Sequence, residues 1–73
     1  MKTITLAGGP RTGKTERADD LYREHTAMGM HVLLDDGGRI RNSLPERRMS
    51  SADVLIITRL TSGQLTETTE FKP

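Results

Sequence analysis

The hydrophobic and polar positions divide the chain into short apolar runs that are separated by glycine-rich or charged segments. Residues 3–7 (TITLA) form a run rich in β-branched side chains that ends at glycines, a pattern that predicts a strand. Residues 30–34 (MHVLL) and 53–58 (DVLIIT) form two further runs without polar alternation. Continuous apolar runs of this length are typical of strands that are covered on both faces, as in a parallel sheet.

Segment 14–28, between the first two runs, has the periodicity of an amphipathic helix. Its apolar side chains recur three or four residues apart and line one face: Ala18, Leu21, Tyr22, His25 and Met28. Most of its charged side chains fall on the opposite face. Gly29 is suited to end this helix, because glycine adopts the left-handed backbone conformation at little cost.

The remaining segments have weaker patterns. Asp-Asp-Gly-Gly at residues 35–38 predicts a turn. A short helix is expected to begin at Ser43, or at Leu44 before Pro45, and to end near Ser50. The tail is polar and threonine-rich and has no periodic apolar face, so we expect it to be loosely ordered or to cover a sheet edge.

The predicted element order is therefore β-α-β-α-β. Right-handed crossovers place the three strands in one sheet, so the predicted fold class is α/β, a small three-stranded parallel sheet with flanking helices. Residues 1–60 form the single predicted domain, and residues 61–73 form the polar C-terminal tail. Three parallel strands leave two open edges, which favours a homo-oligomer or a protein partner that covers these edges.

Composition excludes several classes of function. The 73 residues include no cysteine and only two histidines, so disulfides and thiolate metal sites are excluded and a histidine metal site is not expected. The 11 basic and 10 acidic residues nearly balance and only two residues are aromatic, which argues against nucleic-acid binding. The N-terminal apolar run is too short for a signal peptide or a membrane span, so we expect a soluble cytoplasmic protein.

Residues 8–15, GGPRTGKT, carry the strongest chemical signal. They fit the pattern G-x-x-x-x-G-K-[ST], and they lie between a predicted strand and a predicted helix, as that pattern requires. A glycine-rich loop lets backbone N–H groups converge on phosphates, and the helix N-terminus adds partial positive charge. The expected phosphate-binding residues are Gly8, Gly9, Arg11, Thr12, Gly13, Lys14 and Thr15. Lys14 would reach the outer phosphates, and the hydroxyl of Thr15 would bind Mg²⁺.

The loop resembles the GGPGSGKGT and GPPGTGKT loops of the P-loop NTPase superfamily, and within it those of the small-molecule and nucleotide kinases. Arg11 stands where a glycine is common in those loops. The resemblance covers about residues 1–60 and implies a truncated P-loop fold with strand order 2-3-1 that binds ATP or GTP together with Mg²⁺. The carboxylate that ends the third strand in that superfamily is missing, because Thr58 and Arg59 stand there. Hydrolysis is therefore expected to be weak or absent.

The second predicted strand offers a substitute carboxylate. HVLLDDGGRIR, residues 31–41, is similar to the LLDGDNVR segment of adenylylsulfate kinases. This likeness implies that Asp35 or Asp36 acts as a general base. Lys14 of the glycine-rich loop is the third candidate catalytic residue. Plain turn formation is an alternative interpretation of the two aspartates. Arginines that would form a lid over the phosphates, or else a solvated basic loop, are Arg39, Arg41, Arg47 and Arg48.

Three functions remain open. The one we favour is a small P-loop protein that binds nucleotide phosphates, with weak or absent hydrolysis and little discrimination among bases. The second is a phosphotransferase or ATPase that is completed by oligomerisation or by a partner. The third is a protein-interaction or inhibitor protein that retains a P-loop scaffold. A chain this short would suit a phage or a mobile element.

Overall fold

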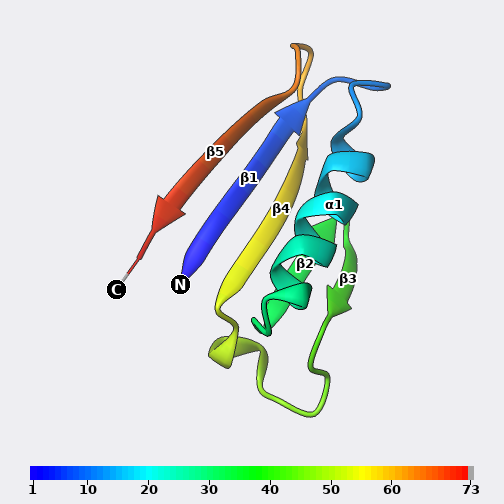
Figure 1. Ribbon diagram of the computed structural model, residues 1–73. Helices are drawn as coiled ribbons and strands as arrows, with labels where there is room; N and C mark the ends of the chain where they lie inside the picture. Colours follow the sequence, from blue (N-terminus) through cyan, green and yellow to red (C-terminus); the bar gives the residue numbers. More distant parts are fainter. Residues whose placement is uncertain (73) are drawn as a thin grey trace.

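One mixed β-sheet with a single α-helix across one face forms the fold (Figure 1). The computed structural model describes residues 1–72 of the protein. The strands are β1 (Lys2–Gly8), β2 (Val32–Asp36), β3 (Arg39–Asn42), β4 (Val54–Leu60) and β5 (Thr66–Phe71). The helix is α1 (Lys14–Ala27), and a short 3₁₀ turn, η1 (Met49–Ser51), precedes β4. The strands lie in the order β3-β2-β4-β1-β5.

The predicted three-stranded parallel sheet with flanking helices is wrong. β4 pairs in parallel with both β1 and β2, but β3 and β5 add antiparallel strands at the two edges. β3 forms because Gly37 and Gly38 make a two-residue hairpin loop in which both glycines have positive φ, 61° and 91°. This is the geometry of the tight turn that joins antiparallel strands, so the chain reverses instead of entering a second helix.

The short helix expected from Ser43 or Leu44 to about Ser50 is also wrong, and only the three residues of η1 are helical there. Ser43 is instead tied to the start of β2. Its backbone N–H donates to the carbonyl of Val32 at 3.0 Å, and its hydroxyl accepts from the N–H of Val32 at 2.8 Å. These bonds continue the β2–β3 pairing and hold the backbone extended.

Residues 66–71 of the polar tail cover the edge of β1 as strand β5. The register runs from Lys2 opposite Phe71 to Ala7 opposite Thr66. Threonine suits an exposed strand because its branched side chain fits the pleated backbone and its hydroxyl stays in water. The N-terminal amino group of Met1 also donates to the carbonyl of Lys72 at 2.7 Å, so the two ends of the described chain lie together.

The core lies between the sheet and α1. Alternate side chains of the three parallel strands point toward the helix, where they meet Ala18 and Leu21, and each is at most 1% exposed: Ile4, Leu6, Val32, Leu34, Val54 and Ile56. Full burial of one such aliphatic side chain contributes roughly 1.5–3 kcal/mol. The opposite face of the sheet has no helix over it among the described residues.

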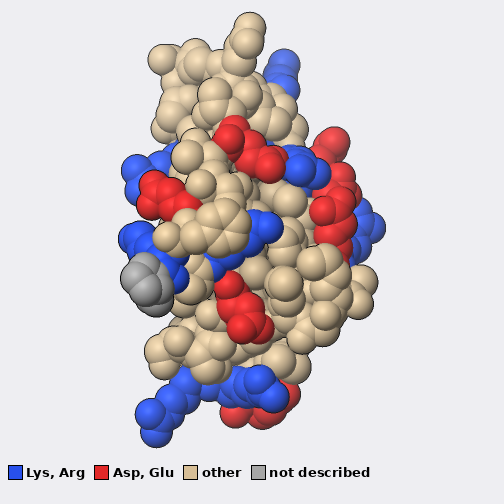
Figure 2. Space-filling view, turned by 60° about the vertical axis from the view of Figure 1, so that its left-hand side comes forward, with Lys and Arg blue, Asp and Glu red and all other residues tan. Residues whose placement is uncertain are grey.

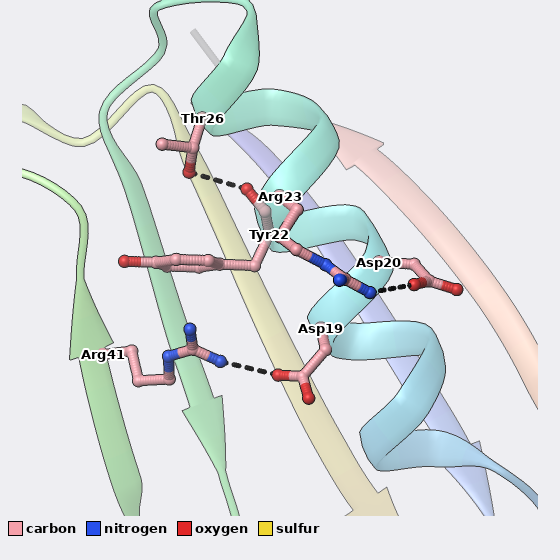
Figure 3. Close-up of polar contacts among 6 residues, drawn as sticks. All are labelled: Asp19, Asp20, Tyr22, Arg23, Thr26 and Arg41. Carbon is pink, nitrogen blue, oxygen red and sulfur yellow. Dashed lines mark hydrogen bonds and ion pairs between the residues drawn. The ribbon is translucent and has the colours of Figure 1, made fainter.

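Ion pairs join α1 to both edge strands. Asp19 accepts from the guanidinium of Arg41 on β3 at 2.6 Å, and Arg17 donates to Glu67 on β5 at 2.8 Å. Figure 3 shows the β3 side, where Arg41 also lies beside the ring of Tyr22, 4.3 Å from its centre. The helix is therefore held across the whole width of the sheet.

The Arg17–Glu67 pair predicts a pH-dependent contribution to stability. The hydrogen bond from Arg17 holds the pKa of the Glu67 carboxyl below its ordinary value. A carboxyl group whose pKa is lower in the folded protein than in the unfolded protein stabilises the fold at pH values above the unfolded-state pKa. This stabilisation is lost as the pH falls through the pKa of the folded state. We expect Glu67→Gln to lower the free energy of unfolding at pH 7 by at most about 1 kcal/mol, because the pair is solvent-screened.

Urea unfolding of the wild type and of Glu67→Gln at pH 7 and at pH 2 would measure this contribution. Glu70→Gln is the matched control, because Glu70 lies on the same strand and in no ion pair of the described residues. An equal loss at both pH values would contradict the ion-pair explanation.

Candidate functional site

The loop of residues 8–15 leaves the carboxyl end of β1 and leads directly into α1. Gly13 is the N-cap of the helix in a left-handed conformation, with φ 87°, and no side chain caps the helix there. The first turn of any helix has backbone N–H groups without partners inside the helix. At this terminus those donors face outward from the carboxyl edge of the sheet, together with the partial positive charge of the helix.

Two side chains hold the loop closed on the carbonyl of Gly9. The hydroxyl of Thr12 donates to this oxygen at 2.8 Å, and the ammonium of Lys14 donates to it at 2.9 Å. The positive charge of Lys14 is therefore drawn across the loop, next to the free amides. Because the ammonium has three protons, the bond to Gly9 leaves it further donors for an anion.

The connection between β4 and β5 supports the loop from behind, a role that our sequence analysis missed. Gly9 donates its N–H to the carbonyl of Gly63 at 2.9 Å, and Thr61 donates to the carbonyl of Gly8 at 3.0 Å. A Cβ at Gly8 would lie 3.1 Å from the Cα of Leu65 and 2.7 Å from the hydroxyl oxygen of Thr12. Only glycine therefore allows this close approach.

A hollow of about 230 Å³ lies at the loop, and its lining residues are Arg11, Thr12, Gly13, Lys14, Thr15 and Glu16. Two cations and the helix terminus favour an anion there. The carboxylate of Glu16, which the motif does not anticipate, opposes it. The lining contains no aromatic or large apolar side chain, so the hollow suits a charged group better than a base or an acyl chain.

Arg11 has an unfavourable backbone conformation. Its φ is 61°, and it is the one residue other than glycine with positive φ among those the structure describes. The left-handed conformation costs a residue with a Cβ roughly 1–2 kcal/mol. Glycine at this position would avoid most of that cost.

The structure separates the two candidate aspartates. Asp36 lies on the helix side of the sheet, at the carboxyl end of β2, and accepts from the hydroxyl of Thr58 at 2.9 Å. Asp35 points to the other side, opposite Ile57 in the register, and accepts from the N–H of Gly38 at 3.1 Å. Asp36 and the loop therefore share one edge and one face of the sheet, whereas Asp35 serves the hairpin turn.

The four arginines of the expected lid are not gathered over the loop. Arg41 is held by Asp19 and Tyr22 on the flank of the helix, as Figure 3 shows. Arg47 and Arg48 belong to the connection that leads to the amino end of β4, at the opposite end of the sheet from the loop (Figure 1). Arg39 alone lies at the carboxyl edge, opposite Asp36 in the β2–β3 register.

Charges elsewhere on the molecule are mixed. On the face drawn in Figure 2, the Lys and Arg side chains are interspersed with Asp and Glu, so no broad region of one sign forms there. Residues 1–72 contain no group of three or more His, Cys, Asp or Glu side chains placed to hold a metal ion. None of the described helices is long and apolar enough to cross a membrane.

The backbone of Arg11 leads to a stability prediction. We expect Arg11→Gly to raise the free energy of unfolding by about 0.5–1 kcal/mol, because glycine relieves the left-handed strain but adds freedom to the unfolded chain. Arg11→Ala removes the same guanidinium and keeps the strain, so its stability should stay near that of the wild type. Chemical unfolding of all three proteins measures the difference, and equal stabilities for the glycine and alanine variants would contradict the assignment of strain.

No protein-family model, curated protein or solved structure significantly matches this chain.

Proposed function

We propose that the protein binds the phosphate chain of a nucleoside triphosphate, ATP or GTP, in the loop of residues 8–15, with weak or absent hydrolysis. The observation that carries this proposal is the uncapped, glycine-led N-terminus of α1 beside the hollow and the Lys14 ammonium. Free amides, a helix dipole and a nearby cation act on the same point, and each favours negative charge.

The loop residues have distinct roles in this proposal. The backbone amides of Gly13, Lys14 and Thr15 donate to phosphate oxygens, and the ammonium of Lys14 adds a point charge. The exposed hydroxyl of Thr15 is suited to contact a Mg²⁺ ion that arrives with the nucleotide. The ion would neutralise phosphate charge when bound.

Weak turnover follows from the residues around the loop. β4 carries Thr58 and Arg59 near its carboxyl end, where a carboxylate would otherwise position the metal and its water. Arg41, Arg47 and Arg48 lie away from the loop, so few cations are available to stabilise a transferring phosphoryl group. Binding without efficient chemistry is the function that these residues support best.

Slow phosphoryl transfer is the second candidate, and Asp36 is the observation in its favour. Of the two candidate aspartates, it is Asp36 that lies at the carboxyl edge on the side of the loop, and the hydroxyl of Thr58 donates to its carboxylate. We expect Asp36→Asn to leave ATP affinity within about twofold, since no phosphate contact is removed, and to abolish any slow turnover. Release of phosphate from radiolabelled ATP over hours measures this, and unchanged turnover would exclude Asp36 as the base.

Lys14 provides the direct test of nucleotide binding. We expect Lys14→Met to weaken ATP binding at least tenfold, about 1.4 kcal/mol, because a charge-assisted contact to phosphate is lost. Isothermal titration with Mg·ATP measures the affinity, and Lys72→Met is the control for loss of one positive charge far from the loop. Circular dichroism checks that the loop variant remains folded. Absence of binding by the wild type at millimolar ATP would overturn the proposed function.

A further inference from the structure

The face of the sheet that points away from α1 carries an apolar patch on its central strands. Residues paired in register point to the same face, and Leu55 on β4 is paired with Leu33 on β2. Ile57 follows Leu55 two residues later on the same face. Ile40 of β3 lies on this face too, with 58% of its surface exposed, and Asp35 lies between Ile40 and Ile57 in the register. None of these four side chains belongs to the core beneath α1, but Leu33 is only 8% exposed within the single chain, and Leu55 and Ile57 are partly exposed. We call this surface the open face.

The open face is large enough to form a stable interface. Five strands at a spacing of about 4.8 Å give a width of roughly 24 Å. The chain exposes 4980 Å² of surface, whereas a compact monomer of this mass exposes about 4500 Å². A standard protein interface removes about 800 Å² from each partner, and most of one sheet face supplies that area.

Charges on the open face are complementary to the same face of a second copy. Asp35 of β2 lies beside Ile57, and Arg59 of β4 lies two residues beyond Ile57 on the same face. A two-fold axis that runs parallel to the strands, between β2 and β4, sets Leu33 of each copy over Leu55 of the other. The same rotation sets Asp35 of each copy over Ile57 of the other, two residues before Arg59 and within reach of the long Arg59 side chain. One operation therefore matches both the apolar and the charged positions, as a symmetric interface requires.

We propose that the open face is the dimerisation surface of this protein and that its occupant is the open face of a second copy. The two sheets stack about 10 Å apart, with their apolar patches between them and the two Asp35–Arg59 pairs toward the rim. Each copy then has both faces of β2 and β4 covered. The phosphate loop stays accessible, since it lies at the carboxyl edge of the sheet and on the side of α1. This proposal does not depend on nucleotide binding.

Sedimentation equilibrium of the full chain tests the surface first. We expect the wild type to sediment with the mass of two chains at tens of micromolar, and Leu55→Glu to sediment as a single chain. Met28→Glu is the matched control, because Met28 is 62% exposed after the end of α1 and lies away from the open face. A monomeric wild type would overturn the proposal, as would a dimer that Leu55→Glu leaves intact. Circular dichroism confirms that each variant is folded.

A charge exchange between two chains tests the symmetry. Asp35→Arg alone places a cation opposite Arg59 in both pairs across the axis. Arg59→Asp alone places an anion opposite Asp35 in both pairs. Each variant should therefore dimerise at least about tenfold more weakly than the wild type. An equimolar mixture restores both pairs in a heterodimer. Mass and affinity near the wild-type values in the mixture support the proposed axis. A mixture that stays as dissociated as the separate variants would overturn it.

Discussion

Burial of one face of the three parallel strands beneath α1 is the constraint on which the rest of the molecule depends. Side chains alternate between the faces of a strand, so the inward position of Leu34 and Ile56 sets the direction of every neighbour on β2 and β4. The same alternation turns Asp36 toward the side of the loop of residues 8–15 and Asp35 away from it. A shift of β2 by one residue would expose the core and exchange the two carboxylates.

The loop keeps its shape through contacts that need no ligand. The carbonyl of Gly9 holds both Thr12 and Lys14, and the β4–β5 connection packs closely against the two adjacent glycines. Donors that are already arranged lose less conformational freedom when an anion binds. Arg11 is the local exception, since its left-handed backbone is strained and the surrounding contacts must hold it there. Such strain is typical of loops whose shape serves binding.

The central strands β2 and β4 have apolar side chains on both faces of the sheet, and the single helix α1 covers one of these faces. The continuous apolar runs in the sequence indicate strands that are buried on both faces. Within the chain, α1 buries the side chains on one of these faces. On the other side, Leu55 and Ile57 remain partly exposed, and the proposed dimer would cover them with the same face of a second copy.

The sequence by itself determined the local elements. Residues 3–7, the glycine-rich loop and segment 14–28 became β1, the loop and α1 within a few residues, because strand propensity, glycine turns and helical spacing act between near neighbours. The apolar runs at 30–34 and 53–58 likewise became most of β2 and β4. The candidate phosphate residues follow from the same local pattern, since their spacing along the chain is the signal.

Only the tertiary structure decided the sheet and the surroundings of the loop. β5 is a polar strand, and its pairing depends on the open edge of β1, whose paired residues lie 59 to 69 positions away in the chain. The separation of Asp35 from Asp36, the support of Gly9 by Gly63 and the distance of Arg47 from the loop also depend on strand register and direction. These contacts join segments far apart in sequence, and no local propensity encodes which of them will meet.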